Sequence, residues 1–395
     1  MNETYGSFFD QFSIGYNSVH TQLSICICMF GTVANILNIA VLTRKEMLGP
    51  TNLLLTGLSL AQLGLVVNYF TLIIYQYLRF SCFANWYSFV LTFYKLVNVN
   101  LSIVFHTIAL SHTVLLAVFR FIAIRLPTKA RKYVSIHSAR VVIASLYLSI
   151  PVVCLPVFFS TVIAKLDPLA NRDPYSDGCN RTGEDIYDLT FTNNNVLMQL
   201  PVWLFGTLFK IVPCFVISVL SYLLIGSLKQ VERKKLQLKG NGTAKPGHTR
   251  SESKRTQRNR ITLMLVIIVL LFVVVEFPQG IMCFFVGIWG NDFAFQVYNN
   301  LGEFFEMLTL LYSSINFILY CTMSTQFQKS FRDMVCSSRC QSRFKAEEAC
   351  SQFNAVGATA PPGGNQPSPY PIQTKQNDDD DAETKLLQNV EIDQS

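Results

Sequence analysis

Five charged side chains lie inside long apolar stretches of this 395-residue sequence, where a charge is costly if the stretch crosses a membrane. They are Lys95, Lys210, Glu276, Glu303 and Glu306. Glu303 and Glu306 are three residues apart, so a helix would place both carboxylates on one face. Glu276 lies two residues before Pro278, which would kink its helix toward the neighbouring helices. Three carboxylates that reach one cavity would suit a cationic ligand.

Three alternatives to ligand binding stay open for these acids. Glu303 and Glu306 could be solvated at a helix end, or they could pair with Lys95 or Lys210. Glu276 could instead serve as a structural switch.

The remaining polar residues do not indicate a catalytic or metal site. His106 and His112 are six residues apart, so they do not share a helix face and make a poor metal pair. The chain has only five histidines, and neither a His-Glu-x-x-His motif nor a Ser/His/Asp spacing stands out. Polar side chains within a membrane span usually face other helices, which we expect of Asn98 and His106. We therefore expect no enzyme activity, no cofactor and no metal.

Seven apolar stretches must position these residues. Half of the sequence is hydrophobic and only 14% is charged, whereas a soluble domain has about 25% charged residues. The stretches are residues 24–42, 52–78, 87–119, 141–163, 196–226, 261–288 and 301–321. Each is close to or above the ~20 residues that a helix needs to cross a bilayer. The sequence therefore predicts an all-α membrane protein, a bundle of seven transmembrane helices.

The distribution of Lys and Arg predicts the topology of this bundle. Basic residues concentrate in the connections after the first, third and fifth stretches, above all in residues 227–260, whereas residues 1–23 have none. Basic loops face the cytosol, so we expect the N-terminus outside and the C-terminus inside the plasma membrane. The net charge of +7 then points at membrane lipids and a cytosolic partner, and no nucleic-acid partner is expected.

Four segments follow from this topology. Residues 1–23 would form an extracellular N-terminus, and residues 24–321 the bundle. Residues 322–344 would form an amphipathic helix and a cysteine-containing segment beside the membrane. Residues 345–395 are rich in Pro, Gly and Asp and cannot bury enough apolar area to fold, so we expect a disordered cytoplasmic tail.

Cysteines and glycosylation sequons can be sorted by compartment. Cys82 and Cys179 lie in the outer connections, on the oxidising side, and are the expected disulfide pair. The sequons at Asn2 and Asn180 also lie outside, where glycosylation can occur. Candidates for palmitoylation, with free thiols as the alternative, are Cys336, Cys340 and Cys350.

Several polar, basic and proline residues recur at characteristic places in the spans: Asn35, Arg120, Pro213, Tyr222, and Asn316 and Tyr320 in Asn316-Phe317-Ile318-Leu319-Tyr320. On these positions, residues 20–335 resemble a rhodopsin-like G-protein-coupled receptor. The resemblance implies that these residues, from Arg120 onward, serve activation and coupling to a heterotrimeric G protein, with arrestin or a kinase as further partners. It also implies that the amphipathic segment after the last span is an eighth helix.

Three positions depart from this family's pattern. Gln62 stands where the family has an Asp that can hold sodium, and a neutral amide binds a cation weakly. Phe119 stands where an acid usually pairs with the following arginine, so other contacts must hold the resting state. Lys95 stands where the usual disulfide cysteine would fall, so the expected disulfide would have to start from Cys82.

The segment Glu276-Phe277-Pro278-Gln279-Gly280, together with residues 44–52 and 313–321, resembles invertebrate myosuppressin and FMRFamide-type peptide receptors. This group is greatly expanded in nematodes. The resemblance implies a ligand that ends in Arg-Phe-amide, signalling mainly through inhibitory G proteins, and expression in neurons or other peptide-responsive cells.

The predicted ligand site combines the acids with rings and polar groups. Its members are Glu306, Glu303, Glu276, Phe277, Gln279, His106 and Asn98. The peptide's Arg would pair with Glu306 or Glu303, and its Phe would enter rings supplied by residues 272–285. Binding would favour a pivot at Pro278 that opens an inner cleft for the G protein beside Arg120, Tyr222 and Tyr320.

Two other functions stay open. A chemosensory receptor for a small molecule would share the fold and differ only in the pocket. A channel or transporter would need a polar path or internal repeats, and the sequence shows neither.

Overall fold

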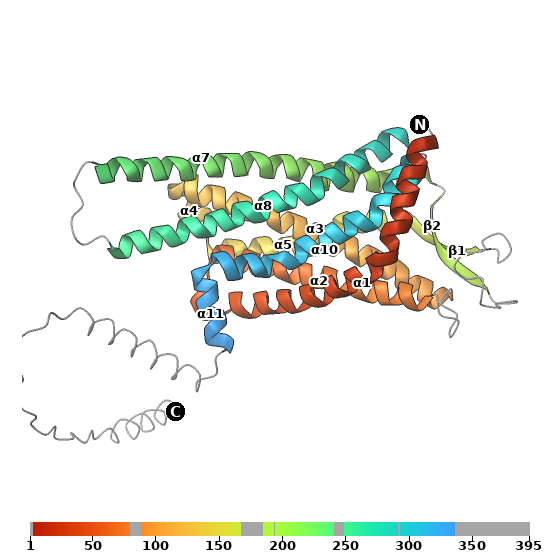
Figure 1. Cartoon of the computed structure of the whole chain (residues 1–395), viewed down its shortest axis with the longest axis horizontal. Coiled ribbons are helices and arrows are strands. Elements are labelled where there is room, and N and C mark those ends of the chain that lie inside the picture. Colours follow the sequence, from red (N-terminus) through yellow and green to blue (C-terminus); the bar gives the residue numbers. More distant parts are fainter. Residues whose placement is uncertain are drawn as a thin grey trace, which may run out of the picture. The chain divides into compact units, whose positions relative to one another are not determined.

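Seven long helices run side by side through the molecule (Figure 1). The computed structural model describes residues 3–79, 88–166, 185–192, 194–240, 249–290 and 293–335. In these residues, the segments long and apolar enough to cross a membrane are Phe8–Leu42, Pro50–Tyr75, Phe89–Arg125, Ile136–Phe158, Gln199–Gly226, Val266–Trp289 and Gln296–Met323. The predicted all-α bundle of seven spans is confirmed.

The helices of the bundle extend beyond the apolar segments. They are α1 (Glu3–Leu42), α2 (Pro50–Arg79), α3 (Phe89–Arg125), α5 (Ile136–Phe158), α7 (Val212–Gly240), α8 (Thr249–Trp289) and α10 (Asn299–Met323). The shorter helical segments are η1 (Lys45–Met47), α4 (Pro127–Tyr133), α6 (Asn195–Pro201), η2 (Val202–Ile211), η3 (Ala294–Tyr298) and α11 (Thr325–Val335). Because η2 is a π-helix inside the fifth span, this span is locally wider than an α-helix.

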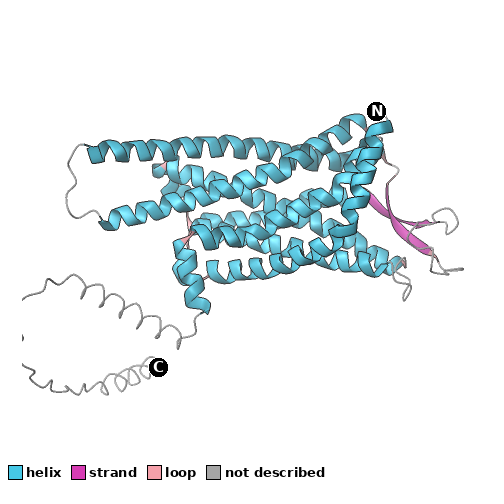
Figure 2. Ribbon diagram, in the orientation of Figure 1, coloured by secondary structure: helices cyan, strands magenta, loops and turns pink. Residues whose placement is uncertain are grey.

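Two boundaries differ from the sequence prediction. α1 begins at Glu3, so most of the expected N-terminal segment is a continuation of the first helix. α5 ends at Phe158, and residues 161–163, which the sequence predicts to be part of this span, instead begin strand β1 (Thr161–Leu166). β1 pairs antiparallel with β2 (Ile186–Phe191) (Figure 2). This hairpin and the start of α1 lie at one end of the bundle, here called the hairpin end, and α11 lies at the other (Figure 1).

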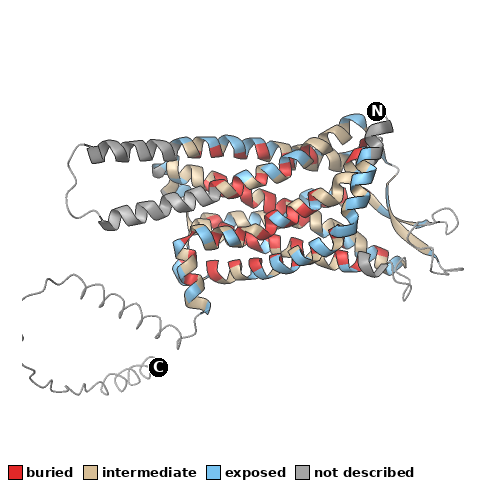
Figure 3. Ribbon diagram, viewed as in Figure 1, coloured by how far each residue is buried: buried red, intermediate tan, exposed pale blue. Residues whose placement is uncertain are grey.

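The buried residues face the interior of the bundle, around α3 (Figure 3). α3 contacts α2, α5, α7 and α8, which makes it the central helix. Toward α11, Phe272 packs edge-to-face on Tyr312 with ring centroids 6.0 Å apart. The ring centroids of Tyr320 and of Phe327 on α11 are 5.5 Å apart, so this contact packs α11 against the end of α10. The predicted amphipathic eighth helix is therefore present.

Small residues let the fifth and sixth spans approach closely. A Cβ atom at Gly206 would lie 2.4 Å from the Cβ of Cys283, which no real pair of atoms tolerates. The absence of a side chain at this position thus brings η2 against α8, as small residues do between membrane helices. This approach places Lys210 of η2 beside Glu276 of α8.

Candidate ligand-binding site

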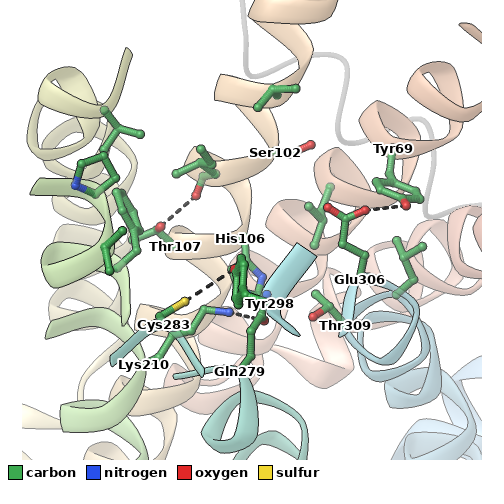
Figure 4. A pocket seen from close by; sticks show the side chains of 18 of the residues that line it. Tyr69, Ser102, His106, Thr107, Lys210, Gln279, Cys283, Tyr298, Glu306 and Thr309 are labelled. Carbon is green, nitrogen blue, oxygen red and sulfur yellow. Dashed lines mark hydrogen bonds between the residues drawn. The ribbon is translucent and has the colours of Figure 1, made fainter. Parts of the chain in front are cut away.

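A cavity of about 390 Å³ lies between the spans (Figure 4). Its walls come from α2, α3, η2, α8, η3 and α10, with smaller contributions from α5 and α6. The polar side chains that line it are Tyr69, Ser102, His106, Thr107, Lys210, Gln279, Cys283, Tyr298, Glu306 and Thr309. Of the predicted ligand-binding residues, Glu306, Gln279 and His106 therefore share one cavity.

Glu306 is the carboxylate that a ligand in this cavity can reach. Its side chain is exposed toward the cavity, and the hydroxyl of Tyr69 donates a hydrogen bond to its Oε2 over 2.6 Å (Figure 4). Among the residues that the structure describes, no Lys, Arg or His lies within salt-bridge distance of it. Glu306 is thus oriented by a neutral donor and, within the described residues, has no cationic side chain at salt-bridge distance.

Glu303 faces a different helix although it lies one turn from Glu306. Its Oε2 lies 2.6 Å from Nε2 of His20 on α1, and it does not line the cavity. His20 is only 4% exposed and also lies 3.2 Å from the hydroxyl of Tyr69. Glu303 pairs with His20, whereas Lys95 pairs with Asp188 and Lys210 with Glu276, so the alternative in which Glu303 or Glu306 pairs with one of these lysines is not observed. Of the three acids considered, Glu306 is the one among the described residues that lines the cavity.

Lys210 forms a buried ion pair with Glu276 at the side of the cavity opposite Glu306. Its Nζ lies 2.9 Å from Glu276 Oε2, and it also donates to the Oε1 of Gln279. Nε2 of His106 lies 3.3 Å from the same Glu276 oxygen. Glu276 is completely buried and does not line the cavity, so it meets a ligand only through its partners.

Besides Glu303 and Glu276, two further predicted ligand residues lie outside the cavity. Phe277 is 41% exposed on the outside of the bundle, so the prediction that it lines the site is not supported. Asn98 is buried against α2, where its Oδ1 accepts a hydrogen bond from Thr71 and its carbonyl accepts one from Asn68. The role of Asn98 is therefore to join α2 and α3.

The rings at the cavity also differ from those expected. Phe272 belongs to the apolar core, while Phe284 packs on Trp203 and Phe285 stacks on Trp289 at 4.5 Å. The rings that line the cavity are those of Tyr69, Phe205 and Tyr298, from three different elements. The face that each ring presents depends on how its helix is rotated in the bundle, which sequence periodicity did not fix.

The residues expected to serve activation lie in α3, α7, α8 and α10. Pro278 lies within α8, between Glu276 and Gln279. Asn316 is buried and donates to Gln62 Oε1 over 2.9 Å. Within the described residues, Arg120 makes no salt bridge to an acidic side chain. The other three residues of this set are Pro213 in the first turn of α7, Tyr222, which is 78% exposed, and Tyr320, which is 1% exposed.

The hairpin is tied to α3 by an ion pair. Nζ of Lys95 lies 2.8 Å from Oδ1 of Asp188 in β2, and the hydroxyl of Thr92 donates to the carbonyl of Tyr187. Lys95 stands where receptors of the resembling family carry a disulfide cysteine, so an ionic contact links α3 to the hairpin at this point. Sequence reasoning missed this contact because nothing near Asp188 signalled a strand.

Several predicted sites lie outside the described residues. These are the disulfide pair Cys82 and Cys179, the sequons at Asn2 and Asn180, the palmitoylation candidates Cys336, Cys340 and Cys350, and the tail 345–395.

Comparisons with known proteins agree with this architecture. A model of the family described as serpentine type 7TM GPCR chemoreceptor Srw matches residues 22–338. The chain is 30% identical to the G-protein coupled receptor dmsr-1 of Caenorhabditis elegans over 354 residues, which covers 80% of this chain and 68% of that protein. It is also 28% identical to sex peptide receptor-related protein 2 of the same organism, over 84% of this chain and 75% of that protein. The identity to the sex peptide receptor of Drosophila melanogaster is likewise 28%, over 76% of this chain and 69% of that protein. The chain therefore belongs to the Srw family of serpentine seven-transmembrane G-protein-coupled receptors, and it is a multi-pass membrane protein rather than an enzyme.

Proposed function

We propose that this receptor binds a neuropeptide through a cationic side chain that pairs with Glu306. The observation that carries the proposal is a carboxylate exposed to the cavity and lacking a cationic partner in the described residues. A charge-assisted contact in a desolvated site contributes ~1.5–3 kcal/mol, or about ten- to a hundredfold in affinity. A peptide ligand is supported by the relatives that are named as sex peptide receptors.

The cavity would hold the end of the peptide. Its volume of about 390 Å³ is near the lower limit of ligand pockets, which span roughly 300–1,000 Å³. We propose an Arg-Phe-amide end, whose guanidinium pairs with Glu306 and whose ring packs among Tyr69, Phe205 and Tyr298. The rhodopsin-like and myosuppressin/FMRFamide-type motifs described above support this ligand class.

Signal transmission would start at the contacts of Lys210. This side chain joins the fifth span to residues on both sides of Pro278, since it contacts Glu276 before the proline and Gln279 after it. A ligand that alters these contacts favours a different bend of α8, and it shifts the equilibrium only by its preference for that state. The bend would open a cleft beside Arg120 for a heterotrimeric G protein, of the inhibitory type, with Tyr222 and Tyr320 at the same cleft.

The proposed topology puts the hairpin end outside the cell and α11 inside. It rests on the basic residues of the connections between spans, and it implies a receptor in the plasma membrane of neurons or other peptide-responsive cells. The same topology would allow glycosylation, a Cys82–Cys179 disulfide and palmitoylation at the predicted positions. Membrane lipids, and arrestin or a kinase, are the further partners proposed at the inner side.

A chemosensory receptor for a small molecule is the second candidate. The family is described as chemoreceptors, and a cavity of this size would enclose a small cationic molecule completely. Such a ligand would also pair with Glu306, so the two candidates differ in whether a peptide chain must continue beyond the cavity.

A ligand screen with one matched pair of variants tests the proposal. Cells that express the receptor and a reporter of G-protein activation are exposed to amidated peptides and to small amines. We expect activation by peptides ending in Arg-Phe-amide, a loss of potency of about ten- to a hundredfold in Glu306→Gln, and little loss in Glu303→Gln. Equal potency on wild type and Glu306→Gln, at equal surface expression, would refute the role of Glu306. Activation by small amines alone would favour the chemosensory function.

A further inference from the structure

The charges around the cavity do not cancel. Lys210 and Glu276 form an ion pair, so the positive charge that lines the cavity is already matched from behind by a buried carboxylate. Glu306 adds a second carboxylate, so the ionised forms of Lys210, Glu276 and Glu306 together sum to one negative unit. A ligand end that carries one cation and no carboxylate would neutralise the site, and an end that carries both a cation and a carboxylate would not.

We propose that Glu276 determines specificity, by making the site select a ligand whose end near Lys210 is an uncharged amide and reject the corresponding carboxylate. The inference rests on the proposed function, because it concerns the second end of a ligand that Glu306 anchors.

The contacts of Lys210 give the physical reason. Its ammonium group has three hydrogens, and it already donates to Glu276 Oε2 and to Gln279 Oε1. One donor remains for the cavity, which suits the carbonyl oxygen of an amide. A carboxylate must lose its hydration to enter the cavity, and this desolvation costs free energy unless the carboxylate pairs with a cation. Lys210 offsets the cost only in part, because it already forms an ion pair with Glu276.

The position of Glu276 makes this effect electrostatic rather than steric. The carboxylate is completely buried and does not line the cavity, so its replacement by Gln leaves the walls of the site in place. The change removes one negative charge and leaves Lys210 unmatched beside the cavity. The site then becomes neutral overall, and Lys210 can pair with a ligand carboxylate.

A pair of probes that differ by one charge measures this selection. The tetrapeptide Phe-Leu-Arg-Phe-amide and the same peptide with a free carboxylate are compared by competition binding to full-length receptor in membranes. We expect wild type to prefer the amide by at least tenfold, which corresponds to ~1.4 kcal/mol. In Glu276→Gln we expect this preference to fall at least tenfold, mainly because the acid binds more tightly.

A double variant separates charge from packing. Lys210→Met/Glu276→Gln removes both charges of the buried pair, a change that membrane and soluble cores tolerate better than the loss of one partner. The net charge at the site returns to one negative unit, so we expect the preference for the amide to return. If Glu276→Gln fails to reach the cell surface, the double variant decides, because equal binding of acid and amide by it would overturn the inference.

The remaining outcomes distinguish this inference from the proposed function. An unchanged preference in well-expressed Glu276→Gln, or equal binding of both probes by wild type, overturns the selection by charge and leaves the peptide receptor intact. If neither probe binds wild type, the Arg-Phe-amide proposal fails, and the inference fails with it.

Discussion

The ion pair between Lys95 and Asp188 should hold the hairpin on α3, and its removal is predicted to open the hairpin locally. The two side chains are only 18% and 25% exposed, so water screens their contact less than it screens a surface pair. Exposed pairs contribute about 0.2–1 kcal/mol and hydrogen bonds to sheltered charges about 1.5–3 kcal/mol. We therefore expect Lys95→Met to cost ~1–2 kcal/mol, which raises the open population of the hairpin roughly 5- to 30-fold.

Hydrogen exchange measures this opening directly. Backbone amides of residues 186–191 in the solubilised receptor should exchange faster in Lys95→Met by the same factor, while amides in α2 and α3 stay unchanged. The charge-exchanged variant Lys95→Asp/Asp188→Lys should recover part of the protection.

The hairpin also contains a matched control. Lys165 pairs with Asp185 over 2.6 Å, but both side chains are 58% exposed. Their contact raises the pKa of Lys165, chiefly through the hydrogen bond to Asp185, yet a lysine is charged at neutral pH with or without that shift. Lys165→Met should therefore leave exchange in the hairpin nearly unchanged. Equal exchange in wild type and Lys95→Met, or equal effects of the two lysine variants, would refute the reasoning.

Two further predictions concern the walls of the site. Gly206→Ala should destabilise the receptor by ~1–3 kcal/mol, because the new Cβ would collide with Cys283. Gly226→Ala should not, since its Cβ would meet open space. A thermal shift assay on solubilised receptor in which the two variants behave alike would contradict this prediction. Tyr298→Ala should reduce peptide potency in the reporter assay, whereas Phe277→Ala should not, because Tyr298 lines the cavity and Phe277 does not. A loss of potency in Phe277→Ala but not in Tyr298→Ala would show that the ligand contacts the outside of α8.

The number of spans could be predicted from the sequence because it depends on composition and length alone. Glu306 could be picked out as a candidate site residue together with Glu303 and Glu276, because a carboxylate inside an apolar span is costly and usually marks function. The boundaries of the first and fourth spans were less accurate. Residues 161–163 are apolar enough to prolong a helix, and their pairing with residues 189–191 makes them part of a strand instead.

The partners of the charged residues could not be predicted. Glu276 and Lys210 are 66 positions apart, and Glu306 and Tyr69 are 237 apart, so their contacts depend on the rotation and depth of each helix. Phe277 shows the same limit, because an apolar ring fits lipid and bundle interior equally well. Lys210 did carry a usable signal, since a buried lysine in an apolar span requires a partner, and Glu276 was one of the few acids available.

Exchange of the charges across the proposed contact tests the central claim most directly. The receptor and its Glu306→Lys variant, at matched surface expression, are assayed with Phe-Leu-Arg-Phe-amide and with Phe-Leu-Glu-Phe-amide. Pairing at Glu306 predicts that wild type prefers the Arg peptide by at least tenfold and that Glu306→Lys reverses the preference, whereas Glu303→Gln keeps it. A Glu306→Lys receptor that still prefers the Arg peptide would contradict the account.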